Sequence, residues 1–199
     1  GAAGSMPGEL HKLWKSGDVE GYHMEYGFSC MGYEIPAAIG VNLAEPDRPN
    51  VIFVGDGSYM MMNSELSTAV MMGISTTIIV TDNRGFGCIN RLQKSTGSEP
   101  FNNLFKDSHH QKLPNIDYVL HAKSLGAKAE KANSIEELED LVEKFINRKE
   151  VNVIVIDTDP DQSTEEGGTW WDVAIPEVSK NQNVKKAFED YSIFRKKKN

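Results

Sequence analysis

An aspartate lies between two glycines in the stretch VIFVGDGSYMMM, directly after four apolar residues that are typical of a buried strand. Gly55 and Gly57 let the backbone turn tightly and come close to a ligand. The backbone N–H groups of such a turn can bind phosphate oxygens. A carboxylate beside a phosphate is repelled unless a cation lies between them, so Asp56 indicates a divalent metal. Mg²⁺ fits, because it is often shared between one or two protein oxygens and substrate phosphates.

Oxygen-bearing residues also follow the next predicted strand, the β-branched stretch TTIIVT at residues 76–81. Asp82 and Asn83 come directly after it. Asn83 offers a neutral amide oxygen, and Gly85 can add its backbone carbonyl. Ligands of open parallel sheets bind beyond the carboxyl ends of the strands, so we expect Asp56, Asn83 and Gly85 to form one Mg²⁺ site. Either stretch by itself is more often a simple turn, but the pair, separated by one helix, favours the metal site.

Strands and helices alternate along the chain, and this order predicts how the two turns are brought together. Short apolar stretches at residues 51–54 and 151–158 are typical of strands that are buried on both faces, and residues 127–132 are a further strand candidate. Helical patterns occupy the intervals, at residues 34–45, 63–73, 115–126 and 134–150. The alternation predicts an α/β fold in three layers, with a parallel sheet and helices on both faces.

Local signals predict where these helices begin and end. Ser134 and Glu137 form a capping box at the start of the most regular helical pattern. Asn63 or Ser64 is expected to cap the helix that follows the GDG turn, and Gly73 comes directly after its expected end.

The rest of the chain is expected to be less regular. Residues 82–114 are predicted to be a long polar loop, residues 1–10 to be rich in turns, and a last helix to lie near residues 183–195. Residues 1–160 are expected to form one binding domain, and residues 161–199 a tail that packs on it. Within that tail, Trp170 and Trp171 are expected to pin the tail to the domain or to cover the site.

Composition narrows the class of partner. The formal net charge of -8 argues against nucleic acid or an anionic membrane as the main partner. Apolar residues make up 39% of the chain and no apolar run is long enough to span a membrane, so we expect a globular protein. Cys30 and Cys88 lack metal-ligand spacing, and we expect free thiols in a reducing compartment, the cytoplasm.

The order of GDG, helix, strand and Asn83 resembles the signature of thiamine diphosphate enzymes of the acetolactate synthase and pyruvate decarboxylase group. The stretch CMGYEIPAAIG is similar to a segment of the same enzymes. This resemblance implies a thiamine diphosphate-binding fold, with thiamine diphosphate and Mg²⁺ as cofactors. It implies that Met31 wedges the cofactor into its bent shape and that the carbonyl of Ser29 accepts from the aminopyrimidine. Without the motif, Met31 would be read as a core methionine.

Further stretches resemble one family within this group, the trihydroxycyclohexane-dione hydrolases of myo-inositol breakdown. These are GAAGS, GYHMEYGFSCMGYEIP, DNRGFGCIN and GGTWWDVAIPEVS, in that order. The family opens a cyclic 1,2-diketone at a C–C bond, so the resemblance implies such a diketone as substrate. It also implies that the complete enzyme is a homo-oligomer in which a pyrimidine-binding domain, of the same or a second chain, meets this one.

The resemblance assigns two sets of residues. The cofactor-binding set is Ala3, Gly4, Ser5, Ser29, Cys30, Met31, Gly55, Asp56, Gly57, Ser58, Asn83, Gly85, Phe86 and Gly87. The residues expected to face the substrate are Ile89, Asn90 and Leu92.

The family's activating glutamate lies on a different domain, and none of Glu25, Glu34 and Glu65 matches it. We therefore assign no catalytic residue and expect this chain to be inactive by itself. Glu34 stands where acetolactate synthases carry a glycine, and Leu92 where they carry a tryptophan, which counts against a synthase. Two alternatives stay open: a domain or subunit of another thiamine diphosphate enzyme, of the synthase or 2-oxoacid decarboxylase type, or a non-catalytic diphosphate-binding module.

Overall fold

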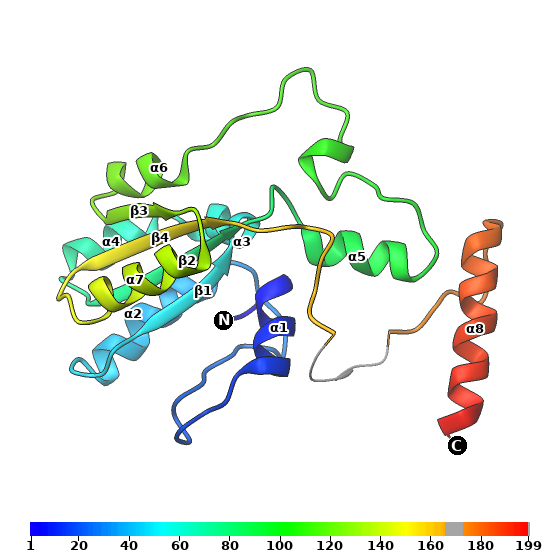
Figure 1. Ribbon diagram of the computed structural model, residues 1–199, viewed down its shortest axis with the longest axis horizontal. Helices are drawn as coiled ribbons and strands as arrows, with labels where there is room; N and C mark the ends of the chain where they lie inside the picture. The colour runs from blue at the N-terminus through cyan, green and yellow to red at the C-terminus, as the bar shows by residue number, and fades with distance from the viewer. Residues whose placement is uncertain (166–172, 199) are drawn as a thin grey trace.

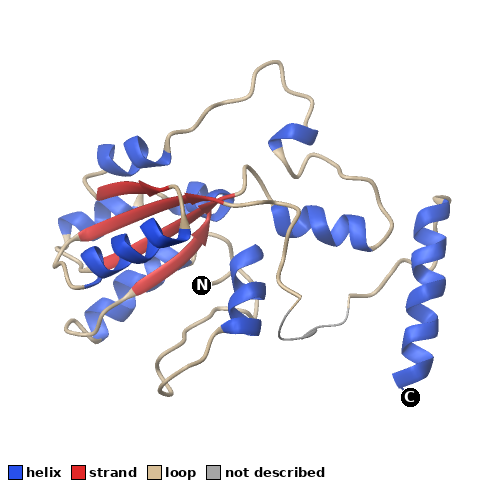
Figure 2. Cartoon of the chain, viewed as in Figure 1, coloured by secondary structure: helices blue, strands red, loops and turns tan. Residues whose placement is uncertain are grey.

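A single parallel sheet organises the chain in the computed structural model, which describes residues 1–165 and 173–198. The strand order is β1-β2-β4-β3, and each neighbouring pair is parallel. All seven residues of β2 are buried, as expected for a strand covered on both faces. The strands are β1 (Val51–Gly55), β2 (Thr76–Asp82), β3 (Lys128–Ala132) and β4 (Val151–Asp157), shown in Figures 1 and 2. The predicted parallel sheet is confirmed.

Helices cover both faces of this sheet, as expected for the three-layer fold (Figure 1). Helices α2, α3, α4 and α6 contribute buried side chains to one core, in which Tyr59 and Leu66 pack against Ile78 and Val153. Helix α7 packs Phe145 on the opposite face. The helices are α1 (Ser5–Leu13), α2 (Glu34–Ala44), α3 (Asp56–Met62), α4 (Glu65–Met71), α5 (Gly87–Ser95), the 3-10 turn η1 (Phe105–Asp107), α6 (Tyr118–Ser124), α7 (Ile135–Ile146) and α8 (Gln182–Lys198).

Strand register brings the two predicted turns together. Gly55 pairs with Thr81 at the carboxyl ends of β1 and β2. The next residues, Asp56 at the start of α3 and Asp82 at the end of β2, therefore lie side by side. This register is specified by the buried side chains of both strands, since a slip of one residue would turn each of them to the opposite face.

A short helix that was not expected lies between the GDG turn and the predicted helix. The turn itself begins helix α3 at Asp56, and α4 follows as a second short helix. The helix expected over residues 63–73 is α4, with Ser64 as its N-cap residue and Gly73, at φ 67, just past its end. Ser64 makes no capping hydrogen bond through its side chain, whereas Asn63 Nδ2 donates to the carbonyl of Met60 at 2.9 Å at the end of α3. Gly55, with an extended backbone, is the N-cap of the additional helix α3, because the backbone turns into a helix as soon as the strand ends.

Two more helices lie where loops were expected. Helix α1 begins within the segment predicted to be rich in turns, and α5 lies within residues 82–114. Both are short and lack an acidic first turn or a side-chain cap, so they carry few local helix signals. At α7, Ser134 Oγ accepts from Glu137 N at 3.2 Å, but the Glu137 carboxylate accepts from Asn133 N at 2.8 Å. In a regular capping box the Glu137 carboxylate would accept from Ser134 N, whereas here it accepts from the preceding residue, Asn133.

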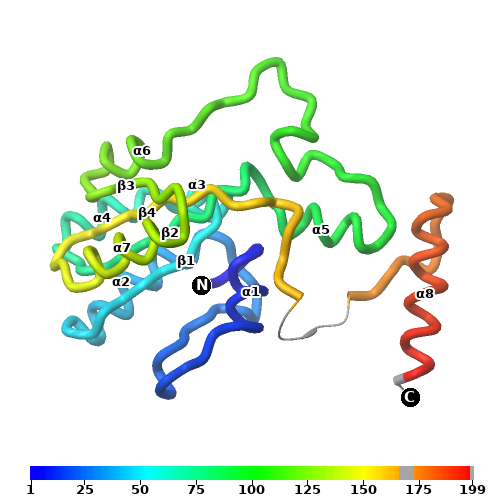
Figure 3. Tube along the Cα trace, viewed as in Figure 1, coloured from blue at the N-terminus to red at the C-terminus, as the bar shows by residue number. Residues whose placement is uncertain are grey.

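The last helix, α8, is longer than the expected 183–195 and lies apart from the sheet, on the side of α5 (Figure 3). That residues 161–199 form a tail that packs on the domain of residues 1–160 stays a prediction. Trp170 and Trp171 lie outside the described residues. Within the described part of the chain, no helix is both long and apolar enough to cross a membrane.

Candidate cofactor and metal site

A cavity of about 310 Å³ lies at the carboxyl ends of β1 and β2, between α1, the start of α3 and α5. Most of the residues predicted to bind the cofactor line it: Ala3, Gly4, Ser5, Ser29, Met31, Gly55, Asp56, Gly57, Ser58, Asn83, Gly85, Phe86 and Gly87. Of the residues predicted to face the substrate, Ile89 and Leu92 line the same cavity. Cys30 and Asn90 do not line it.

The carboxylate of Asp56 joins the two strand-end turns. Its Oδ2 accepts a hydrogen bond from Gly85 N at 2.9 Å, and its Oδ1 accepts a longer one from Asn83 N at 3.4 Å. The side chain is only 2% exposed. Burial raises the pKa of Asp56 from 3.8 to about 6, and the neighbouring charge of Asp82 acts in the same direction. Without a cation, burial disfavours the ionised form of this carboxyl.

Asn83 supplies an oxygen that the described residues leave unpaired. Its amide Oδ1 is buried and has no hydrogen-bond partner among them. A buried polar atom without a partner is costly and calls for an explanation. Together with the carboxylate of Asp56 and a carbonyl at Gly85, this oxygen forms the kind of hard donor set that Mg²⁺ prefers. The residues present therefore fit a bound cation.

The same residues do not form a cluster of the usual acidic or imidazole ligands. Among the described residues, no group of three or more His, Cys, Asp or Glu side chains is placed to hold a metal. The candidate site has one carboxylate, and the other donors are an amide and a backbone carbonyl. Such a sparse set suits Mg²⁺, which usually keeps several waters or shares phosphate oxygens.

Glycines permit the close approach of the two turns. A Cβ on Gly57 would lie 2.5 Å from the ring of Phe86. Gly85 has φ 143, and a Cβ there would clash with the backbone of Asn103 and Leu104. A larger residue at Gly57 would push the two turns apart, and one at Gly85 would push its own turn away from residues 103 and 104. The glycines thus keep the donors of Asp56 and Asn83 within one small space.

The turn that carries Ser29 and Met31 is held by a carboxylate outside the cavity. Glu25 accepts hydrogen bonds from Phe28 N at 2.9 Å and from Cys30 N at 2.8 Å. These bonds lower the pKa of Glu25 below its usual value. Ser29 has φ 52, an uncommon angle for a residue with a side chain. The bonds from Glu25 stabilise this angle, which brings Ser29 and Met31 to the cavity wall.

Helix α5 separates the three residues expected to face the substrate. Ile89 and Leu92 are three residues apart, so they lie on one face of the helix. Ile89 is 49% exposed, whereas Asn90 is 1% exposed and its amide has no partner among the described residues. Asn90 therefore lies inside the protein and away from the cavity.

Several residues at the site were not anticipated from the sequence. Tyr26, Thr81 and Cys88 line the cavity. Burial raises the pKa of the Cys88 thiol above its ordinary value, so it stays protonated at neutral pH. The guanidinium of Arg91 donates to Ser5 Oγ at 3.1 Å and to the carbonyl of Pro160 at 2.8 Å. Recognising α5 as a helix would have drawn attention to Arg91, which lies three residues after Cys88 and so on the same side of the helix.

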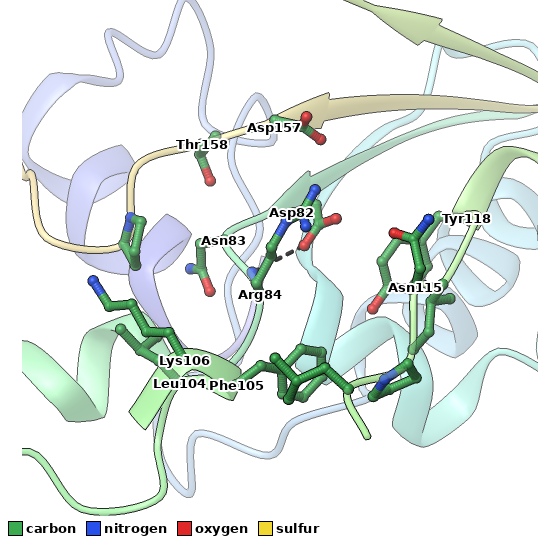
Figure 4. Close-up of a pocket in the computed structure, with 14 residues that line it drawn as sticks. Asp82, Asn83, Arg84, Leu104, Phe105, Lys106, Asn115, Tyr118, Asp157 and Thr158 are labelled. Atoms are coloured by element: carbon green, nitrogen blue, oxygen red, sulfur yellow. Dashed lines mark hydrogen bonds between the residues drawn. The ribbon is translucent and has the colours of Figure 1, made fainter. Parts of the chain in front are cut away.

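A larger cavity, of about 460 Å³, lies on the other side of the turn after β2. Figure 4 shows Asp82, Asn83 and Arg84 on its wall, with Asp157 at the end of β4 and Thr158 directly after it. The N–H of Arg84 donates to Asp82 Oδ1 at 2.9 Å. Among the described residues, Asn83 alone of the predicted cofactor residues lines this cavity, and no glycine does. Its size alone does not make it the cofactor site.

Comparisons with known proteins identify relatives of this chain. The family model described as thiamine pyrophosphate enzyme, C-terminal TPP binding domain, matches residues 2–156, and thiamine pyrophosphate is another name for thiamine diphosphate. A protein of Clostridium tetani named 3D-(3,5/4)-trihydroxycyclohexane-1,2-dione hydrolase is 43% identical over 95% of this chain and 30% of its own length. A protein of the same name from Bacillus subtilis is 42% identical over 94% of this chain and 29% of its own length.

Solved structures show the same fold. Benzoylformate decarboxylase from Polynucleobacter necessarius matches with a TM-score of 0.60 and 23% identity, over 70% of this chain and 26% of that one. Rhodococcus jostii 4-hydroxybenzoylformate decarboxylase, described as thiamine diphosphate-dependent, matches with a TM-score of 0.59 and 25% identity, over 70% of this chain and 25% of that one. The chain thus spans about 30% of the length of the curated relatives it matches. It belongs to the thiamine pyrophosphate enzyme family, in the part that forms the C-terminal cofactor-binding domain.

Proposed function

We propose that the 310 Å³ cavity binds the diphosphate end of thiamine diphosphate through Mg²⁺. The observation that carries this proposal is the unpaired Asn83 Oδ1, which lies in the same cavity wall as the buried carboxylate of Asp56. A cation would pair both groups and would neutralise diphosphate charge at the same point. Asp56, Asn83 and the Gly85 carbonyl are its proposed protein ligands.

The rest of the cavity wall would hold the organic part of the cofactor. Backbone N–H groups near Ala3, Gly4 and Ser5, and at the start of α3, are suited to diphosphate oxygens. Met31 and the carbonyl of Ser29 are the proposed contacts of the rings. When bound, thiamine diphosphate serves as an electron sink for cleavage of a bond beside a carbonyl. The residues of this chain bind and orient it, and exclude water from its surroundings.

We infer that the complete protein hydrolyses a C–C bond of a cyclic 1,2-diketone, the trihydroxycyclohexane-1,2-dione named in its relatives, as a step of myo-inositol breakdown in the cytoplasm. The support is the 43% identity to such a relative over 95% of the chain. Ile89 and Leu92, which border the cavity on one face of α5, are the proposed contacts of the substrate side. Addition of water completes the ring opening and leaves an acid.

A second domain is needed to complete this site. We propose that a pyrimidine-binding domain, from the same or a second chain of a homo-oligomer, covers the cavity and supplies the activating glutamate. Exposed apolar side chains beside the cavity favour such a partner: Met60 is 41% exposed, Met61 50% and Phe86 38%. Apolar surface of this kind is typical of contact sites. By itself the chain is proposed to bind cofactor weakly and to have no turnover.

Calorimetry separates the proposal from its alternatives. We expect the complete protein to bind thiamine diphosphate only when Mg²⁺ is present, and to bind ADP much more weakly. A non-catalytic diphosphate module would bind both alike. Ring opening of the diketone, measured beside decarboxylation of 2-oxoacids such as pyruvate and benzoylformate, then identifies the reaction. Preference for a 2-oxoacid would refute the hydrolase function and leave cofactor binding intact.

A further inference from the structure

Glu34 is a buried carboxylate that the cofactor site as described above does not use. It is the first residue of α2 and only 3% exposed. Its Oε2 accepts from Ser58 Oγ at 2.8 Å and from Gly32 N at 3.1 Å. Its Oε1 accepts a longer bond from Ala3 N at 3.4 Å. One side chain therefore contacts three segments that are far apart in the sequence.

Each of these three segments borders the cofactor cavity. Ala3 precedes Gly4 and Ser5 in its wall, and Ser58 belongs to the start of α3. Gly32 follows Met31 in the turn that begins at Ser29. Glu34 itself does not line the cavity, so it has no direct access to a ligand bound there. Its contacts instead fix the positions of the walls relative to one another.

The hydrogen bonds of Ser58 connect the turn of residues 29–32 to the start of α3. A hydroxyl has one proton to donate, and Ser58 Oγ donates it to Glu34. The same Oγ accepts from Gly32 N at 2.7 Å. Gly32 has φ 89, and a Cβ there would lie 2.6 Å from Met62 Cγ. The turn can therefore approach α3 only through a glycine, and Ser58 has no proton left for a diphosphate oxygen.

We propose that Glu34 is a positioning residue, which holds the Ala3, Gly32 and Ser58 segments in the arrangement that fits the cofactor. The expected effect of Glu34 on cofactor binding rests on the proposed function. The positioning of the three segments by Glu34 does not depend on that function. Ser58, which was expected to contact the cofactor, acts within this proposal as the link between Glu34 and the turn.

Three variants of the complete protein distinguish the contacts. Glu34→Gln keeps one acceptor oxygen for Ser58 and Gly32 but turns an amide donor toward Ala3 N. Glu34→Ala removes every acceptor, and Ser58→Ala removes the link to Gly32. Glu65→Gln is the matched control, because Glu65 is also the first residue of its helix and does not line the cavity.

Amide hydrogen exchange without cofactor tests the positioning directly. We expect Glu34→Gln to raise exchange about threefold in residues 2–8 only, since the bond to Ala3 is long. Glu34→Ala should raise exchange in residues 2–8 as well, and should raise it about tenfold in residues 28–33. Ser58→Ala should raise exchange in residues 28–33 alone. Glu65→Gln should change neither segment. Faster exchange throughout the sheet, including β4, would mean general destabilisation and would overturn the proposal, as would no change in Glu34→Ala.

Cofactor titration with saturating Mg²⁺ tests the consequence. Glu34→Ala should raise the thiamine diphosphate concentration for half-saturation about tenfold, and Glu34→Gln about threefold, by the loss of the same bonds. Turnover at saturating cofactor should stay within about twofold of the unmodified protein, because Glu34 contacts no reacting group. Unchanged half-saturation in Glu34→Ala would overturn the link to cofactor binding. If the unmodified protein bound no thiamine diphosphate, the proposed function would fail, and the local exchange pattern would still decide the positioning.

Discussion

Replacing Asp56 with asparagine should stabilise the chain in the absence of metal and remove its metal binding. The folded state favours the neutral form of this carboxyl, because burial raises its pKa from 3.8 to about 6. One pKa unit corresponds to about 1.4 kcal/mol. Ionised Asp56 therefore costs the folded state about 3 kcal/mol at pH 7, a cost that a bound cation would offset.

The sign of the pH dependence follows from the raised pKa. The stabilisation from the neutral form is fully present below pH 3.8, the ordinary value, and is lost as the pH rises through about 6. An asparagine stays neutral at every pH. Its oxygen can accept from Gly85 N, but its amide group would face Asn83 N, which costs about 1 kcal/mol. The net gain at pH 8 is then about 1–2 kcal/mol, or about 2–8 °C in Tm for a chain of this length.

Thermal unfolding of the 199-residue chain at pH 8 and pH 4, with a chelator present, measures this effect. Asp56→Asn should be the more stable form at pH 8, and its advantage should disappear at pH 4. Asp117→Asn is a suitable control, because Asp117 caps α6 by accepting from Leu120 N at 2.9 Å and lies away from the cavity. Lower stability of Asp56→Asn at pH 8, or a gain that is independent of pH, would refute the reasoning.

Three further outcomes follow from the site. Asp56→Ala and Asn83→Ala should each abolish Mg²⁺-dependent binding of thiamine diphosphate in calorimetry, whereas Asp117→Ala should retain it; binding retained in either site variant would contradict the metal assignment. Ile89→Ala and Leu92→Ala should change the relative rates for different diketones and leave cofactor half-saturation unchanged, and the reverse result would place them at the cofactor. The chain alone, given cofactor and Mg²⁺, should show no diketone ring opening, so turnover near that of the complete protein would mean that it carries its own activating base.

The parallel sheet and the approach of its two strand-end turns could be predicted because their signals are local. β2 is apolar or β-branched up to Asp82, and its end is marked by a change to polar residues and glycine. Adjacent parallel strands end at one edge, so Asp56 and Asn83 had to approach each other. Gly55 and Gly57 marked the other turn in the same way.

The helices α1, α3 and α5 could not be predicted, and the consequence is clearest at α5. It lies within a long polar segment with glycines and has only two large aliphatic side chains, Ile89 and Leu92, so a loop was expected there. In a loop, Ile89, Asn90 and Leu92 could all face one ligand. In a helix, neighbouring residues point about 100° apart, so Ile89 and Leu92 share a face that excludes Asn90. The hydrogen bonds that Glu34 accepts could not be predicted from the sequence either, because their donors are brought together only by the fold.

An unpaired buried oxygen does not by itself indicate a metal, as a comparison of Asn83 with Asn152 shows. Both side chains are buried, and the Oδ1 of each has no partner among the described residues. Asn152 lies within β4, between other strands, and lines neither of the two cavities described above. Asn83 lies in a cavity wall with Asp56, whose carboxylate charge is disfavoured by burial, which raises its pKa. The proposed metal site therefore rests on the pair, since one cation would satisfy both groups.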